Sequence, residues 1–181
     1  RRQRQMCIRD RSACKWLVME WDGRESSGIF VGNPIGWLLR NVNSSLALFK
    51  DNGIRSFSKV LIAIRPGRRN KRFIDVADKI CRHFGASLTL LNIVSETDSN
   101  QKIKRTEKSS IELISETKSK SIVKIIKSNN PVEAISEESA SYDLLILGTP
   151  EKDNWISVLF GAGEDRFVKK AACSVLRLTI K

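Results

Sequence analysis

The chain has 181 residues, 41% of them hydrophobic, and carries a formal net charge of +12 at pH 7. This length allows one complete hydrophobic core and part of a second, and apolar runs such as LLIL at 144–147 are too short to span a bilayer. Four cysteines without CxxC spacing exclude a disulfide framework and indicate a reducing, cytoplasmic compartment. The single histidine, His83, excludes a His-rich metal site.

The first twelve residues, RRQRQMCIRDRS, have neither an apolar period nor the hydrophobic centre of a signal peptide. They resemble translated sequencing-adapter sequence, and we expect 1–12 to be an artefactual leader outside the folded unit. This leader holds five Arg and one Asp, so it supplies +4 of the +12 and leaves about +8 for the rest of the chain. With this smaller charge and no aromatic-basic motif, we expect no specific nucleic-acid partner.

Two stretches of the chain, 16–49 and 144–178, share one pattern: a strand, a loop ending in glycine, a helix and a second strand. With one gap in the loop, Gly32 aligns with Gly161 and Ser45 aligns with Ser174. Such a repeat indicates two copies of one domain. The predicted boundaries are the C-terminal part of a first domain at 13–50, a linker at 51–58 and a complete domain at 59–181.

Within the complete domain, short apolar runs predict strands, and apolar residues at helical intervals predict helices. The polar stretch at 95–108 is predicted to be a loop, and Asn130 followed by Pro131 predicts the start of a helix. In chain order we expect a strand at 59–64, a helix at 73–84, a strand at 87–94, a helix at 111–118, a strand at 121–126, a helix at 131–140, a strand at 143–147, a helix at 163–171 and a strand at 174–178. This alternation predicts a parallel sheet with helices on both faces.

The blocks KVLIAI, ASLTLLNIV, SYDLLILGT and FGAGEDRFVKKAACSVLRL follow one another in an order and spacing that resemble the universal stress protein family. The resemblance covers 59–180, and the block at 16–49 resembles the end of a second such domain. It implies an α/β fold with an open five-stranded parallel sheet of order 3-2-1-4-5, Rossmann-like or adenine nucleotide alpha hydrolase-like. It also implies that two domains associate through their last strands, here Ser45 to Phe49 with Ser174 to Leu178. Tandem pairs in this family include the cytoplasmic tails of amino-acid permease-type transporters.

ATP-binding members of the family carry a glycine motif at the end of strand four: Gly, two residues, Gly, nine residues, Gly, then Ser or Thr. In this chain Gly148 and Gly161 match the first and third glycines, whereas Glu151 and Ala162 replace the second glycine and the hydroxyl residue. Glu151 would put a carboxylate where a phosphate would sit, which opposes binding. The resemblance therefore implies a degenerate ATP site, in which tight turns explain the two remaining glycines. The alternative is an adenine nucleotide held there by altered contacts.

Two further features belong to the same edge of the predicted sheet. Thr149 follows Gly148, and Arg65 stands where the family usually has an acid that contacts the nucleotide sugar; both complete the candidate nucleotide cleft. Arg68, Arg69 and Arg72 crowd the turn after the first strand, at the carboxyl edge where open α/β folds bind ligands. They are interpreted either as a solvated basic loop or as a contact to phosphate or an anionic membrane surface.

Two functions from different classes remain open. The leading hypothesis is a non-catalytic regulatory domain pair of the universal stress protein type, with the cytoplasmic tail of a membrane transporter as its expected setting. The alternative is a free-standing ATP-binding stress-response protein. Neither reading assigns catalytic residues or metal ligands.

Overall fold

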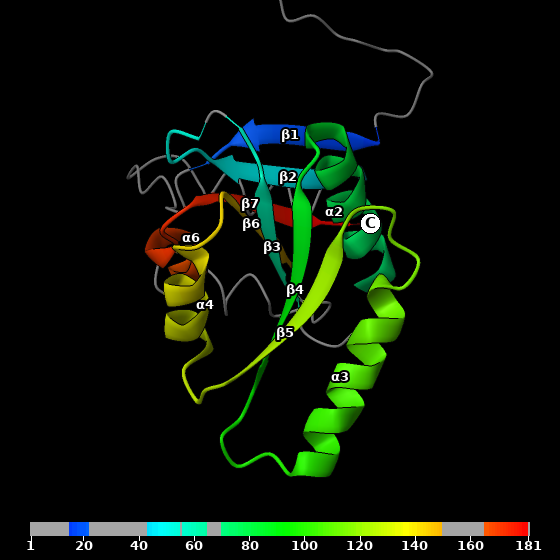
Figure 1. The fold of residues 1–181 in the computed structure, drawn as a ribbon. Coiled ribbons are helices and arrows are strands. Elements are labelled where there is room, and N and C mark those ends of the chain that lie inside the picture. The colour runs from blue at the N-terminus through cyan, green and yellow to red at the C-terminus, as the bar shows by residue number, and fades with distance from the viewer. Residues whose placement is uncertain (1–14, 22–42, 55, 65–69, 150–164, 181) are drawn as a thin grey trace, which may run out of the picture.

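The computed structural model describes residues 15–21, 43–54, 56–64, 70–149 and 165–180. The described strands form one seven-stranded sheet, with four described helices packed on its two faces (Figure 1). The strands are β1 (Trp16–Glu20), β2 (Ser45–Lys50), β3 (Lys59–Ala63), β4 (Ser87–Val94), β5 (Ser121–Lys127), β6 (Leu144–Gly148) and β7 (Ser174–Thr179). The helices are α2 (Asn70–Phe84), α3 (Asn100–Ile114), α4 (Pro131–Ser139) and α6 (Arg166–Lys170).

The sheet has the order β1-β2-β7-β6-β3-β4-β5. The five strands from β3 to β7 are all parallel, and their order is the predicted 3-2-1-4-5. The predicted five-stranded parallel sheet is therefore present within 59–181, and β1 and β2 extend it to a mostly parallel sheet of seven strands, in which β2 runs antiparallel to β7. The physical reason is that β7 would otherwise leave a row of backbone amides and carbonyls unpaired.

The pairing of β2 with β7 places Leu46 opposite Thr179 and Lys50 opposite Val175. The segment that follows β2 is fastened to the same strand. The backbone N–H of Asn52 donates to Ser174 Oγ at 2.9 Å, and Asn52 Nδ2 donates to the carbonyl of Cys173 at 2.8 Å. We call the described residues 15–21 and 43–50 the front block. This block and the residues after it are therefore bonded to the end of the chain as parts of one sheet.

The second helix of the 59–181 unit differs from its prediction. α3 covers Asn100–Ile114, so the stretch predicted as a loop is largely helical and the predicted helix at 111–118 begins eleven residues too late. Ser99 caps the helix by accepting a hydrogen bond from the N–H of Lys102. Sequence reasoning missed this helix because only Ser110 and Ile114 are buried on it, which leaves almost no apolar period to detect.

The other helix boundaries are closer to expectation. Asn130 caps α4 and Pro131 opens it, as predicted. The last helix was expected from residue 163, but Asp165 is its N-cap, so α6 begins at Arg166. The Asp165 carboxylate accepts hydrogen bonds from the N–H groups of Phe167 and Val168, which is why the helix starts there.

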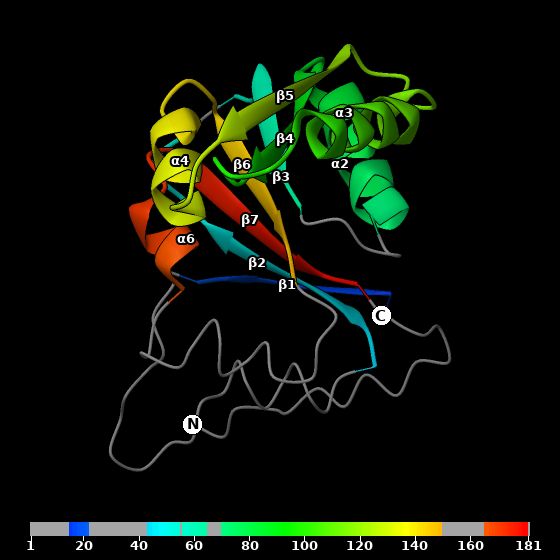
Figure 2. The same cartoon turned by 90° about the horizontal axis from the view of Figure 1, so that it is seen from below.

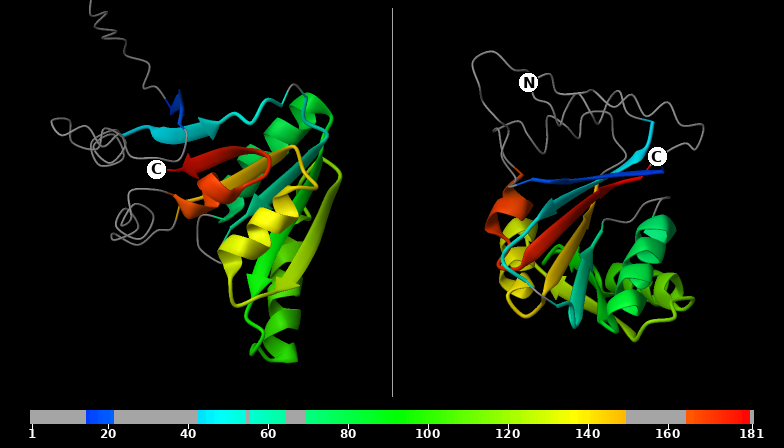
Figure 3. Two further views of the ribbon diagram at one scale, coloured as in Figure 1. Left: turned by 90° about the vertical axis from the view of Figure 1, so that its left-hand side faces the viewer. Right: turned by 90° about the horizontal axis from the view of Figure 1, so that it is seen from above.

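Two apolar layers cover the sheet. α2 and α3 lie on one face, and α4 and α6 lie on the other (Figure 2). The central strands β3 and β6 are buried from both sides, with Leu61, Ile62, Leu145 and Ile146 fully inaccessible. At the far side of the sheet, β1 forms the outer edge beyond β2 and β7 (Figure 3).

The topology brings separate parts of the chain to one edge of the sheet. β3, β4, β6 and β7 all end at this carboxyl edge because they are parallel. β2 is antiparallel to β7, so its first residues lie beside Thr179 at the same edge, and Trp16 of β1 lies beside Ser45. α2 begins near this edge as well, since it follows β3. The candidate sites described below are built here.

Candidate functional site

Gly148, the first residue of the predicted nucleotide motif, ends β6 against two apolar side chains. A Cβ atom at this position would lie 3.1 Å from Ile64 Cγ2 and 3.2 Å from Phe73 Cε2 and Cζ. Ile64 and Phe73 are both buried. Gly148 does not have a positive φ, unlike Gly53 and Gly85. Close packing, rather than the tight turn that the sequence suggested, is therefore what requires glycine here.

This packing decides what the described part of the cleft can accommodate. In the family motif a small first residue lets backbone amides approach a phosphate. In this protein the space beside Gly148 is filled by the ring of Phe73 from the first turn of α2. These side chains belong to the core, and the rest of the motif lies outside the described residues.

The backbone N–H and the hydroxyl of Thr149 both form hydrogen bonds within the protein. Its N–H donates to the carbonyl of Leu178 at 2.9 Å, and its hydroxyl lies 2.9 Å from the hydroxyl of Thr179. Thr149 is buried, and these bonds join the ends of β6 and β7. Its hydroxyl is thus part of the sheet edge.

The remaining residues of the predicted cleft and basic turn divide into two groups. Arg65, Arg68, Arg69, Gly161 and Ala162, together with Glu151, lie outside the described residues. Arg72 is described: it lies on α2 and is exposed. It lines a pocket elsewhere on the same edge.

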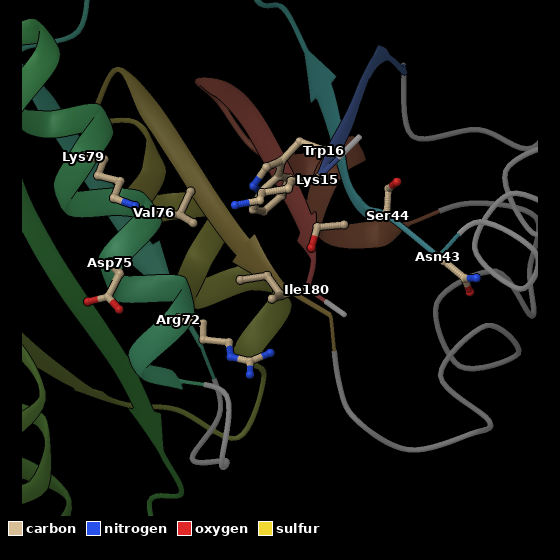
Figure 4. Close-up of a pocket in the computed structure, with 10 residues that line it drawn as sticks. Lys15, Trp16, Asn43, Ser44, Arg72, Asp75, Val76, Lys79 and Ile180 are labelled. Atoms are coloured by element: carbon tan, nitrogen blue, oxygen red, sulfur yellow. The ribbon is translucent and has the colours of Figure 1, made fainter. Parts of the chain in front are cut away.

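That pocket lies between α2 and the ends of the strands contributed by the front block (Figure 4). Its volume is about 440 Å³, within the range of small-molecule sites. α2 forms one wall, the first residues of β1 and β2 form the other, and Ile180 after β7 lies between them. The lining residues are Lys15, Trp16, Asn43, Ser44, Ser45, Arg72, Asp75, Val76, Lys79 and Ile180. We refer to this as the edge pocket.

The edge pocket is basic. It is lined by two lysines and one arginine, and by a single carboxylate, that of Asp75. Asp75 forms an ion pair with Lys71, one helical turn earlier, at 3.3 Å. The carboxylate of Asp75 points away from the centre of the pocket, whereas Lys15 and Lys79 point toward one another from opposite walls (Figure 4).

Sequence reasoning missed the edge pocket because its walls come from segments far apart in the chain. Only Arg72 among its lining residues was a candidate site residue. Lys15, Trp16 and Ser45 belong to the front block and meet α2 only through the pairing of β2 with β7. The charge run after β3 was a partial signal, since Arg72 was counted in it.

A buried ion pair lies near the end of β6. Arg177 Nη2 is 2.8 Å from Asp165 Oδ2, with 6% and 0% of the two side chains exposed. Arg177 Nη1 also donates to the carbonyl of Gly148 at 3.4 Å. Burial lowers the pKa of Arg177, and the charge of Asp165 opposes that shift. The only sequence signal was one arginine in the otherwise apolar strand SVLRLT.

No group of three or more His, Cys, Asp or Glu side chains in the described part of the chain could hold a metal ion. None of the helices in these ranges is long and apolar enough to cross a membrane.

The comparisons with known proteins agree on the fold. The model of the universal stress protein family matches residues 56–178, more than half of the chain. A search of curated proteins finds no match to the sequence. Among solved structures, a universal stress protein from Archaeoglobus fulgidus DSM 4304 is similar with a TM-score of 0.66 at 16% identity. That match covers 90% of this chain but only 60% of the other, so this chain spans about three fifths of that protein's length.

Two other similar structures were solved with nucleotides. A universal stress protein from Archaeoglobus fulgidus in complex with dAMP has a TM-score of 0.53 at 13% identity, over 69% of this chain and 100% of that one. A universal stress protein in complex with cAMP has a TM-score of 0.55 at 15% identity, over 70% and 100%. At these identities the similarity shows the fold alone.

Proposed function

Because the chain belongs to the universal stress protein family, we propose that it is a regulatory protein of this family that does not catalyse a reaction and has a degenerate ATP site. The observation that carries this proposal is the packing of Phe73 and Ile64 against Gly148, at 3.1–3.2 Å from where a Cβ would be. This packing encloses the first residue of the family's phosphate motif in side chains of the hydrophobic core.

The sequence of the motif supports the same proposal. Glu151 and Ala162 replace a glycine and a hydroxyl residue that ATP-binding members carry, and both changes weaken phosphate binding. A regulatory domain can act by changing its contacts with a partner, without turning over a substrate. We further propose that the front block is the end of a second domain of the same family, and that the pair is the cytoplasmic tail of a transporter. The full reading frame tests this setting: transmembrane segments upstream would support it, and a gene without them would contradict it.

An adenine-nucleotide-binding stress protein is the second candidate. It is favoured by the fold similarity to proteins solved with dAMP and cAMP. In that case the nucleotide would have to be held by altered contacts around Gly148, or elsewhere on the carboxyl edge.

Calorimetric titration of the full chain with ATP separates the two candidates. We expect weak binding or none, and no hydrolysis above the rate of the buffer. The double variant Glu151→Gly with Ala162→Ser removes a repelling charge and adds a donor, so it should bind ATP more tightly than the original chain. A dissociation constant near 1 μM for ATP and the original chain, about −8 kcal/mol, would contradict the proposal. The variant Lys79→Met, which alters the edge pocket, is the control: the ATP affinity must be unchanged in it, so that the binding is not at the edge pocket.

A further inference from the structure

Two cationic side chains line the edge pocket from opposite walls, and neither is paired with an acid among the described residues. Lys15 and Lys79 lie on opposite walls and point toward one another (Figure 4). Both are exposed, and neither forms an ion pair with a carboxylate in the described structure. Two like charges aimed into one space repel each other, and an anion between them would turn that repulsion into attraction.

Asp75, the one carboxylate that lines the pocket, does not form an ion pair with Lys15 or Lys79. Asp75 is paired with Lys71, which also contacts Glu116 of the segment after α3. Lys71, which does not line the pocket, is thereby shared between Asp75 and Glu116, and the carboxylate of Asp75 is directed toward it. The pocket therefore keeps a positive balance although α2 carries acidic residues.

The rest of the pocket is suited to a flat, apolar group. Trp16 lies beside Lys15 on the wall formed by the front block, Val76 lies between the two lysines, and Ile180 lies below Lys15 in this view (Figure 4). Trp16, Val76 and Ile180 all belong to or pack against one hydrophobic cluster of the core, so these surfaces are held in place by the fold. An aromatic ring offers a broad surface for stacking with a second ring.

We propose that the edge pocket binds a small phosphate ester with an aromatic body, the phosphate lying between Lys15 and Lys79 and the ring against Trp16, Val76 and Ile180. The site is separate from the predicted nucleotide cleft, since neither Gly148 nor Phe73 lines it. It goes beyond the proposed regulatory function and does not depend on it. It exists only in a chain whose front block is paired with β7, because Lys15 and Trp16 come from that block.

The test uses phenyl phosphate as the probe, because it lacks the adenine that a family-type cleft would recognise. The full chain is titrated by calorimetry at low salt with phenyl phosphate, inorganic phosphate and phenol. We expect phenyl phosphate to bind most tightly and phenol not to bind. Binding of phenyl phosphate should weaken as salt is raised, since its contacts with exposed lysines are screened.

Substitutions then locate the site. Lys15→Met and Lys79→Met should each weaken phenyl phosphate binding about tenfold, the loss expected for one charged hydrogen bond. Lys108→Met, on the exposed surface of α3, is the matched control and should leave binding unchanged. Asp75→Asn should not weaken binding, because it removes the only negative charge of the lining. Circular dichroism melting checks that each variant is folded, which we expect because all four side chains are exposed.

Three outcomes would overturn the proposal. The first is the absence of saturable phenyl phosphate binding at millimolar concentrations. The second is binding that Lys15→Met and Lys79→Met leave unchanged, which would place the ligand elsewhere. The third is equal affinity for phenyl phosphate and inorganic phosphate, which would show that the pocket does not recognise the aromatic ring. None of these outcomes bears on ATP at Gly148, so failure here and failure of the proposed function are distinguishable.

Discussion

Arg177 of β7 and Asp165 at the start of α6 form an ion pair inside the protein, with 2.8 Å between Nη2 and Oδ2. The same carboxylate caps α6, and the same guanidinium reaches the carbonyl of Gly148. The contact is close but is not aligned as a hydrogen bond, and among the described residues Arg177 Nε has no hydrogen-bond partner either. The two charges are therefore held together by attraction at a site that is buried from bulk solvent.

Removing one member of this pair should be costly. We expect Arg177→Met to lower the free energy of unfolding by about 3 kcal/mol, because Asp165 is left as a buried charge without its partner. Asp165→Asn keeps a capping oxygen but isolates Arg177, so it should also destabilise the protein. The double variant should be more stable than the sum of the two losses predicts. Urea unfolding of the four proteins measures this, with Arg166→Met on the exposed face of α6 as the control. Additive losses would show that the two charges do not interact.

Asp78 should make stability depend on pH. It accepts hydrogen bonds at Oδ1 from the N–H groups of Lys118 and Ser119 and from the Ser119 hydroxyl, which fixes the turn after α3 to α2. Burial alone would raise the pKa of Asp78, but the hydrogen bonds from Ser119 and Lys118, helped by the charge of Arg82, lower it below its ordinary 3.8. A lowered folded-state pKa means that the stabilisation is complete above the unfolded-state pKa and is lost as pH falls through the folded-state value.

The variant Asp78→Ala should therefore lose about 2 kcal/mol of unfolding free energy at pH 7, because three donors lose their acceptor. The difference between this variant and the original chain should begin to shrink below about pH 4, where Asp78 is protonated in the unfolded state, and should be lost as pH falls through the lowered folded-state pKa. Urea unfolding at several pH values checks this. Asp75→Ala, an exposed acid on the same helix, should show neither effect. A difference that stays constant down to the acid transition would argue against the stated role.

The two described cysteines should resist alkylation while the protein is folded. Burial raises the pKa of Cys81 to about 12, with a further contribution from the charge of Asp78, and burial raises the pKa of Cys173 to about 11. Only the thiolate reacts with iodoacetamide, so both should stay unmodified at pH 8 and react once denaturant is added. Peptide mapping by mass spectrometry distinguishes them from Cys7 and Cys14, which lie outside the described residues. Rapid labelling of Cys81 in native buffer would show that α2 opens readily.

The outer edge of the sheet should mediate self-association. Among the described strands β1 has one neighbour, β2, and Val18 on it is 66% exposed. An unpaired apolar edge strand favours pairing with a second copy. We expect the chain to associate with rising concentration and Val18→Lys to suppress this, as measured by analytical ultracentrifugation. Ile122→Lys is the matched control, because Ile122 is exposed to a similar degree on β5 at the opposite edge. Equal effects of the two substitutions would mean that association does not use β1.

Much of the fold could be predicted because short apolar runs and the family resemblance act locally along the chain. The strands β3 to β7 were found from runs such as KVLIAI and LLIL, which buried parallel strands require. Asn130 and Pro131 correctly predicted the start of α4. α3 escaped detection because it is held mainly by its cap and by contacts at Ser110 and Ile114, and such a helix has almost no apolar stripe.

The candidate site was less predictable, because residues far apart in the sequence come together to form it. The glycine at 148 suggested a nucleotide motif, yet only the packed structure shows that Phe73, far away in sequence, fills the space beside it. Arg72 was noticed as part of a charge run, whereas its neighbours in the edge pocket, Lys15 and Trp16, were not.

By itself the sequence determined the family, the alternation of strands and helices in 59–181, and the pattern that repeats in the front block. Those properties depend on residue spacing and burial, which are encoded locally. The tertiary structure alone decided that β2 runs antiparallel to β7 and that the sheet has seven strands. It also decided that Lys15 and Lys79 line the same pocket. Strand direction and pocket walls depend on which backbone groups pair and which side chains fill the space between elements, and no local pattern carries that information.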